Sequence, residues 1–375
     1  MYQLFIRLFE FSSVKAGWSR ALEGMRGLAA IAVFFVHYRD QITDWLPEDS
    51  ITRMVAEVLG FLGHTGVDFF FLLSGYLLYG IAINPHFLAL PYFKRRFIRI
   101  YPTYMVVFPL YLLLYYLVPT DKVVPTEMGP YLTFFLANMT LAPPFIYADD
   151  LFITVAWSLR LEVMFYVLLP LTVFLFRLRE RGRAQRLLIF VGVWFAILFF
   201  MPEQLRASMF VFGMVLWEYQ KGGELAVSTR GLNGLALLLL AVTYGLMVGV
   251  RLEGIPWEPW REVAHYCLFV SAFTLAAAAM RGEGWLADFF SWRPLCWVGN
   301  FSYSFFLTHG LTIKAFFVVL AWFFPHAQPV ASSWYWLLLP PVFLLCCLVS
   351  ALLFLLVERP LSLDGRGIAL LWGRS

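Results

Sequence analysis

Residues 26–40 read "RGLAAIAVFFVHYRD", an apolar run that opens with an arginine and carries a histidine 11 residues later. Eleven residues at about 100° each complete three helical turns with only about 20° to spare, so Arg26 and His37 lie on the same face of a helix. A run this long and apolar indicates a membrane-spanning or deeply buried helix. It predicts a helical membrane fold that holds ionisable groups inside.

The composition agrees with that prediction. Of the 375 residues, 61% are hydrophobic and 14% are charged, whereas soluble domains are about 45–50% apolar and about 25% charged. The net charge of +4 is small and indicates no nucleic-acid partner. The 4 cysteines lie in or beside apolar stretches without metal-type spacing, so we interpret them as thiols in the core or facing lipid. The predicted fold class is an all-α, polytopic integral membrane helical bundle.

Ten apolar runs approach the length needed to cross a bilayer core of about 30 Å. The run 129–147 is also apolar, but it is short and closed by Pro143 and Pro144, so we assign it to an outer loop that touches the membrane. The fifth and sixth runs are short, and "MPEQLR" between them predicts a tight turn. The ten predicted spans are 27–45, 62–83, 98–118, 153–176, 187–201, 205–220, 231–250, 262–280, 300–324 and 333–357.

The basic residues give the predicted topology. When the N-terminus is placed in the cytoplasm, most lysines and arginines fall in inner segments, above all in 94–99 and 177–186. This bias is the positive-inside rule, so we expect both termini to be cytoplasmic. The predicted organisation is a cytoplasmic interfacial segment at 1–20, a ten-helix membrane domain at 21–360 and a cytoplasmic tail at 361–375.

Several ionisable residues inside the predicted spans fall at similar depths. Counting about 1.5 Å per residue from the span ends places them about 14–21 Å from the inner surface. Taken singly, each could be a polar contact that bridges two helices, but ionisable groups inside a membrane are functional by default. These residues are His37, Asp68, Glu162, His309 and Lys314, with Arg160 slightly nearer the outer surface. Their convergence predicts a polar site.

The segment "YFKRRFIRIYPTY" at 92–104 is predicted to be a basic inner loop that leads into the next span, with Pro102 in the first turns of the helix. Positive-inside bias alone would place some basic residues there. Arg95, Arg96 and Arg99 are, however, guanidiniums suited to bidentate phosphate binding. Together with Arg26 they predict an anion site at the inner surface, from which the extended pantetheine arm of coenzyme A would reach about as far as His37.

Five blocks of this sequence resemble the membrane acyltransferase-3 family. They are "RALEGMRGLAAIAVFFVH" at 20–37, "HTGVDFFFLLSGYLL" at 64–78, "YFKRRFIRIYPTY" at 92–104, "WSLRLEVMFYVLLP" at 157–170 and "FSYSFFLTHG" at 301–310. Members of this family transfer acyl groups, usually acetyl, from acyl-coenzyme A to sugar hydroxyls of bacterial surface polysaccharides, glycolipids or secondary metabolites. The most specific element is an arginine and a histidine separated by ten residues, which Arg26 and His37 match.

The resemblance implies roles for individual residues. It implies that His37 is catalytic, that Arg26 supports donor binding and that Arg96 and Arg99 are needed for activity. It also implies that Asp68, Ser74, Gly75 and Glu162 line the site. This sequence departs from the family at Glu23, where an aspartate is usual, and at Gly310, where many members have proline. Some members carry a fused extracytoplasmic hydrolase-like domain, which we do not expect after "VERPLSL" at 357–363.

The predicted function is membrane O-acyl transfer from cytoplasmic acetyl-coenzyme A, or another acyl-coenzyme A, to a sugar or glycolipid acceptor. We expect His37 to remove the acceptor proton, with Asp68 or Glu162 orienting the imidazole; a transient acyl-His37 is the alternative. We assign acceptor contacts to Ser74, Tyr76, Arg160, His309 and Lys314, expect no metal, and place the protein in the bacterial inner membrane. The rival function is a ten-helix transporter or a flippase-like component of glycan export.

Overall fold

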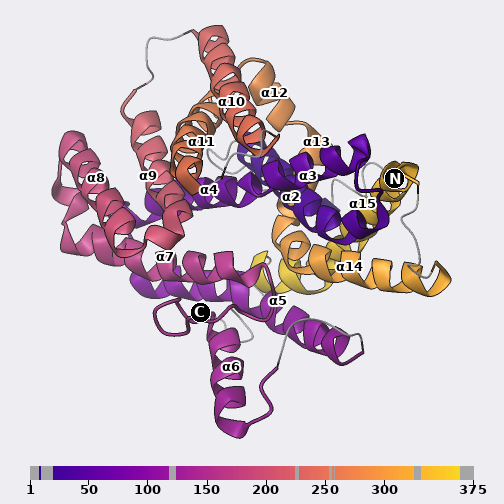
Figure 1. The fold of residues 1–375 in the computed structure, drawn as a ribbon. Helices are drawn as coiled ribbons and strands as arrows, with labels where there is room; N and C mark the ends of the chain where they lie inside the picture. Colours follow the sequence, from indigo (N-terminus) through magenta and orange to yellow (C-terminus); the bar gives the residue numbers. More distant parts are fainter. Residues whose placement is uncertain are drawn as a thin grey trace. The chain divides into compact units, whose positions relative to one another are not determined.

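A computed structural model describes residues 8–9, 20–117, 124–223, 228–252, 256, 258–324 and 331–363. Every regular element in these ranges is helical (Figure 1), in agreement with the predicted all-α class. The chain forms two compact units, which are described separately. Unit 1 comprises 1–85, 172–302 and 329–337, and unit 2 comprises 86–171, 303–328 and 338–375.

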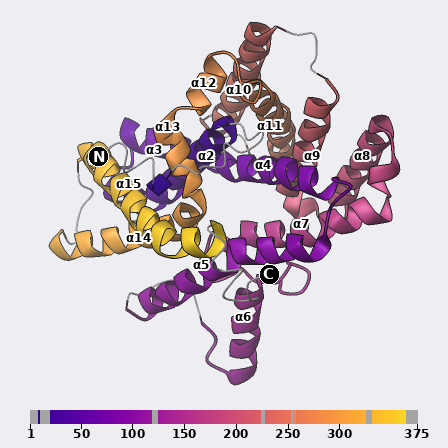
Figure 2. The same ribbon diagram turned by 180° about the vertical axis from the view of Figure 1, so that it is seen from behind.

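Unit 1 contains most of the helices. They are α2 (Arg20–Ile42), η1 (Thr43–Trp45), α3 (Ile51–Gly63), α4 (Thr65–Ala82), η2 (Leu178–Glu180), α8 (Arg183–Phe200), η3 (Pro202–Ala207), α9 (Ser208–Lys221), α10 (Thr229–Leu252), α11 (Glu258–Ala279), α12 (Trp285–Phe290) and α13 (Arg293–Asn300). Helix α2 packs against α3, α4 and α13, and α4 packs against α9 (Figure 2). The segment that holds Arg26 and His37 is therefore central to this unit.

Unit 2 contains α5 (Ala89–Leu117), α6 (Met128–Thr140) and most of α7 (Ala156–Leu175), α14 (Ser302–Phe323) and α15 (Ser333–Leu353). A π-helical segment, η4 (Phe354–Leu363), follows α15 directly and packs against α5. The basic segment expected to be a loop is instead part of α5, which begins at Ala89 and continues through both Pro102 and Pro109. Arg95, Arg96 and Arg99 are therefore carried on a helix.

Within the described residues, 9 helices are long and apolar enough to cross a membrane. They coincide with nine of the ten predicted spans. The predicted span 205–220 is not among them, because Pro202–Ala207 forms the 3₁₀ segment η3 and α9 has only 14 residues; its crossing of the membrane stays a prediction. Such a helix is about 21 Å long, shorter than the apolar core of about 30 Å.

Further helices lie in segments that the sequence assigned to loops, and α3 and α6 are the longest of them. Helix α3 precedes α4, so that Ile51–Ala82 forms one long helical run broken only at His64. Helix α6 occupies part of the outer loop predicted at 129–147. It has 13 residues and ends where Leu141 adopts a left-handed conformation, and it is not one of the candidate spans.

Glycines allow the helices of unit 1 to pack closely. A Cβ added to Gly75 of α4 would lie 2.1 Å from the carbonyl oxygen of Phe210 in α9, and one added to Gly213 of α9 would lie 2.1 Å from the carbonyl oxygen of Leu72. The same relation holds between Gly299 of α13 and the backbone of α2. Small residues at helix crossings are the usual means of close packing in membranes. Gly75 therefore has a packing role beside the site position that the resemblance implies.

The outward faces of several helices carry large apolar side chains. Phe199 and Phe200 of α8 and Trp322 of α14 are each at least 75% exposed. Only 6% of the apolar stretch Arg183–Phe200, which forms α8, is buried. Exposed apolar surface on this scale is costly in water and is expected against lipid. Together with the 9 long apolar helices of the described residues, it identifies a multi-pass membrane protein.

Two predictions concern the ends of the chain and the thiols. The N-terminal segment 1–20 and the tail 361–375 lie almost entirely outside the described residues. All four cysteines are free, with Cys296 and Cys346 buried and Cys267 and Cys347 half-buried. Their burial agrees with the interpretation of these residues as thiols in the core or facing lipid.

Candidate active site

Arg26 and His37 lie on one uninterrupted helix, α2, as the spacing predicts. The 11 residues between them correspond to a rise of about 16 Å along the helix axis. Both side chains are half-buried. Glycines of α2 let this helix pack closely on neighbouring backbones, as at Gly27 and Leu295 of α13. A helix of this kind fixes the separation between a cation and a base.

His37 has a carboxylate beside it that the sequence analysis missed. The His37 Nδ1 lies 3.5 Å from the Oδ2 of Asp40, one turn later on α2. The Asp40 Oδ1 in turn lies 3.0 Å from the Nε of Arg39, and an Arg39 amino group lies 2.9 Å from Glu57 of α3. The spacing of three residues between His37 and Asp40 is the signal that would have found this pair.

Asp68 forms a different ion pair from the one expected. Its side chain is fully buried, and its Oδ2 lies 3.4 Å from an amino group of Arg206 in η3. Arg206 also donates to the backbone carbonyl of His64, at 3.2 Å. The carboxylate that accompanies His37 in unit 1 is thus Asp40, whereas Asp68 joins α4 to the start of α9.

Tyr76, expected to contact the acceptor, donates a hydrogen bond of 2.6 Å to Gln220 of α9. One turn further along α4, Tyr79 donates to the buried Glu218 at 2.6 Å, and Arg186 of α8 pairs with the same carboxylate at 2.6 Å. These contacts fasten α4, α8 and α9 together. Ser74 is half-buried two residues before Tyr76.

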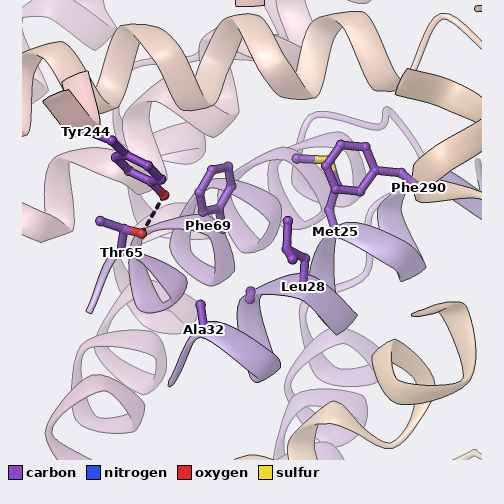
Figure 3. Close-up of a pocket in the computed structure, with 8 residues that line it drawn as sticks. Met25, Leu28, Ala32, Thr65, Phe69, Tyr244 and Phe290 are labelled. Carbon is purple, nitrogen blue, oxygen red and sulfur yellow. Dashed lines mark hydrogen bonds between the residues drawn. The ribbon is translucent and has the colours of Figure 1, made fainter. Parts of the chain in front are cut away.

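A small apolar cavity lies in unit 1 (Figure 3). It is lined by Met25, Leu28, Ala29, Ala32, Thr65, Phe69, Tyr244 and Phe290. Its polar feature is a hydrogen bond of 2.8 Å between the hydroxyls of Thr65 and Tyr244. Its volume is about 40 Å³, room for only a few water molecules at roughly 10–15 Å³ each on the same measure. The cavity is too small for the pantetheine arm of coenzyme A.

Unit 2 holds the other predicted residues, and Arg99 is already paired there. Its guanidinium forms an ion pair with Glu358 of η4, whose side chain is fully buried. Glu358 also accepts hydrogen bonds from the backbone N–H of Ser304, at 3.1 Å, and from its hydroxyl, at 2.5 Å. The guanidinium carbon of Arg99 lies 5.5 Å from the ring centre of Tyr303. π-Helical segments are rare and often mark functional sites.

A second contact joins η4 to α5. Because Pro102 has no N–H, the carbonyl of Ile98 loses its usual helical donor. Ser362 supplies one, since its hydroxyl donates to the Ile98 carbonyl at 2.6 Å. Proline is tolerated inside membrane helices when a side chain satisfies the freed carbonyl in this way. This is how α5 continues through Pro102, where the sequence predicted a helix start.

Arg96 differs from Arg99 although it lies only one turn away. Its guanidinium carbon lies 6.0 Å from the ring centre of Tyr92 and 5.8 Å from that of Tyr166. Within the described part of the chain, Arg96 has no carboxylate partner, and its Nε makes no hydrogen bond. Tyr166 donates to Glu162 at 2.8 Å. Arg96 is therefore a half-buried cation that lies beside two tyrosine rings.

Two further predicted residues of unit 2, Arg160 and His309, contact backbone carbonyls. Arg160 is buried near the start of α7, and its guanidinium donates to the backbone carbonyls of Tyr147, at 3.1 Å, and Asp149, at 3.4 Å. His309 is fully buried in α14, with Nδ1 2.8 Å from the carbonyl of Phe305. Lys314 is half-buried five residues later, and Arg95 is exposed on α5.

The structure thus groups the predicted residues by unit. Arg26, His37, Asp68, Ser74 and Tyr76 belong to unit 1, and the remaining seven belong to unit 2. Within unit 2, Arg96 and Glu162 share Tyr166 as a neighbour. The common depth of the ionisable residues spans both units and stays a prediction.

Comparisons with known proteins bear on the identity of the chain. A family model described as an acyltransferase domain matches residues 19–357. O-acetyltransferase OatA of Staphylococcus aureus is 24% identical over 323 residues, which cover 77% of this chain and 49% of that protein. Acyltransferase MdmB of Streptomyces mycarofaciens is 31% identical over 160 residues, 40% of this chain and 38% of that protein.

This chain therefore spans about half the length of OatA, and less than that of MdmB. No solved structure matches it. The matched region contains every helix described above except part of η4, together with all twelve predicted site residues. A match over this range agrees with the resemblance of the five sequence blocks, and it shows that the chain belongs to the acyltransferase-3 family.

Proposed function

We propose that this protein is a membrane O-acyltransferase that transfers an acetyl group from acetyl-coenzyme A to a sugar hydroxyl of a surface polysaccharide or glycolipid. The observation that carries the proposal is that Arg26 and His37 lie on the same helix, in a chain that matches the acyltransferase model over residues 19–357. The acetyl group is favoured because OatA is named an O-acetyltransferase. The proposed location is the bacterial inner membrane, with both termini in the cytoplasm.

In the proposed reaction His37 acts as the general base. An imidazole can accept a proton at neutral pH. As His37 takes the proton of the acceptor hydroxyl, the oxygen attacks the thioester carbonyl. The C–S bond then breaks, and the coenzyme A thiolate takes the proton back from His37. The products are an acetyl ester and free coenzyme A, so no proton is gained or lost overall.

Arg96 is proposed to bind a phosphate of the donor. A phosphate needs positive charge and directed N–H donors together, and a guanidinium supplies both. Arg96 supports this role because no carboxylate among the described residues forms an ion pair with it. Arg95, on the exposed side of the same helix, and Arg26 of α2 are proposed as additional anion contacts. Arg99 is given no phosphate in this scheme, because Glu358 already holds its guanidinium.

The test is acetyl transfer by purified protein in detergent or nanodiscs, followed by mass spectrometry of the acceptor glycan. His37→Ala should abolish transfer while the protein inserts and elutes as wild type does. His86→Ala is the matched control, because His86 is exposed outside the helices and should leave the rate unchanged. Full turnover by a well-folded His37→Ala protein would refute the proposal. Absence of transfer in the wild type, with movement of glycan across the vesicle membrane, would favour a transporter.

A further inference from the structure

The carboxylate of Asp40 is held in place by a series of charged contacts. Arg39 lies 3.0 Å from one oxygen of Asp40, and the other oxygen faces the Nδ1 of His37. Arg39 is held from the opposite side by Glu57 of α3, at 2.9 Å. Glu57 also lies 3.6 Å from Arg251 of α10. We call His37, Asp40, Arg39 and Glu57 the His37 network.

The path of Arg39 across α3 depends on a glycine. A Cβ added to Gly60 would lie 2.9 Å from the Cβ and 3.0 Å from the Cγ of Arg39. Gly60 comes one turn after Glu57, so the bare backbone at this position gives the Arg39 side chain room to reach Glu57. The network therefore joins residues of two neighbouring helices, α2 and α3.

The neighbours of the network are accounted for on each packed element. Helix α2 contributes Arg39 and Asp40, α3 contributes Glu57, and α10 contributes Arg251. His64, between α3 and α4, interacts electrostatically with both Asp40 and His37. Of these groups, Asp40 is the acidic one within ion-pair distance of the imidazole.

We propose that Asp40 is a positioning residue for His37, and that Arg39 and Glu57 hold its carboxylate in place. The proposal rests on the proposed function of His37 as general base. A carboxylate beside Nδ1 favours the tautomer with the proton on Nδ1 and leaves the lone pair on Nε2. Nε2 then accepts the acceptor proton, and Asp40 stabilises the imidazolium that forms. Asp40 itself touches neither substrate in this scheme.

Asp40→Asn is the direct test, because asparagine keeps the size of the side chain and removes its charge. The buried aspartate of serine-protease triads is worth about 10⁴ in kcat, and a partly exposed, screened carboxylate should give less, so we expect kcat to fall about ten- to a hundredfold. The KM values for donor and acceptor should change little. Asp44→Asn is the matched control, since Asp44 is exposed in η1 four residues further on and should leave kcat unchanged.

A second measurement follows the imidazole itself. Nitrogen-15 NMR of histidine-labelled protein reports which ring nitrogen carries the proton, and a His37→Gln difference spectrum assigns the signal among the 6 histidines. Asp40→Asn should move His37 away from the Nδ1–H tautomer, a change that a purely structural role would not produce. Gly60→Val should cause a smaller shift in the same direction, because it displaces Arg39.

The outcomes separate this inference from the proposed function. If Asp40→Asn keeps the wild-type kcat and the wild-type tautomer while His37→Ala is inactive, Asp40 has no positioning role and the base assignment stands. If His37→Ala is active, the base assignment itself fails. Asp40→Asn could also lose activity because the protein elutes as aggregate. In that case Asp40→Glu, which keeps the charge, should recover both folding and the Nδ1–H tautomer of His37. Failure of Asp40→Glu to recover the tautomer would overturn the inference.

Discussion

Arg96 and Arg99 lie one turn apart on α5, in the same basic segment, yet the structure predicts opposite consequences for their loss. Arg96 rests on two tyrosine rings without a carboxylate partner among the described residues. Arg99 is paired with Glu358, whose side chain is fully buried. Removing Arg96 should therefore weaken donor binding, whereas removing Arg99 should destabilise the fold.

The magnitudes follow from these environments. A charge-assisted contact to a phosphate is worth about 1.5–3 kcal/mol, so Arg96→Ala should lower donor affinity about ten- to a hundredfold. Lysine at this position should restore only part of it, because it keeps the charge and loses the planar fork. Arg99→Ala leaves the carboxylate of Glu358 buried and unpaired, which should cost about 3–5 kcal/mol of unfolding free energy.

The measurements are calorimetric binding of acetyl-coenzyme A to detergent-solubilised protein and unfolding by SDS titration in mixed micelles. Because Arg99→Ala alone could fail to fold, the double variant Arg99→Met, Glu358→Gln is included. It removes both charges and keeps an acceptor for Ser304, so it should recover most of the stability and bind the donor as wild type does. Arg177→Ala, which removes an arginine that is 75% exposed, is the charge control. Equal loss of donor affinity in Arg96→Ala and the double variant would refute the distinction.

Two further predictions concern packing and topology. Gly75→Ala should lower the unfolding free energy by about 1–3 kcal/mol, because the added methyl meets the carbonyl of Phe210. The control Gly192→Ala on α8, where nothing lies within 4 Å, should be neutral or stabilising. Equal midpoints of unfolding for the two variants would contradict the close packing of α4 on α9. In a cysteine-free background, single cysteines at Lys94 and Arg181 should resist a membrane-impermeant thiol reagent in intact cells, because both lie in segments that the positive-inside rule places in the cytoplasm, and labelling of both from outside would reverse the topology.

Much of the fold could be predicted because membrane spans leave a local signal. A run of about 20 apolar residues is recognisable without any knowledge of tertiary contacts, and nine of the ten predicted runs form helices long enough to cross. The shorter helix at 205–220 has a local cause, since Pro202 and the turn after it form the 3₁₀ segment η3 before α9 begins. The helices α3 and α6 were not predicted because each has only 13 residues, too few for a membrane span.

The site was harder to predict because ion pairing depends on distant residues. Nothing in "KRRFIR" distinguishes Arg96 from Arg99; the distinction comes from Glu358, 259 residues away. Asp40 could have been found from its spacing to His37. Depth counting relates groups on different spans, whereas Asp40 lies on the same helix as His37. Depth counting identified polar groups, but not which of them face one another.

The short helix α9 explains why Asp68 is fully buried without being the partner of His37. A helix of 14 residues is about 21 Å long, and polar groups that flank such a short helix are stabilised when they find partners inside the protein. Arg206 precedes α9 and pairs with Asp68, and Glu218 near its other end pairs with Arg186 and Tyr79. Asp68 and Tyr79 both belong to α4, the helix that crosses α9 at Gly75. The two polar contacts therefore lie on either side of the crossing and fix the register of the helix pair, which favours a structural role for Asp68.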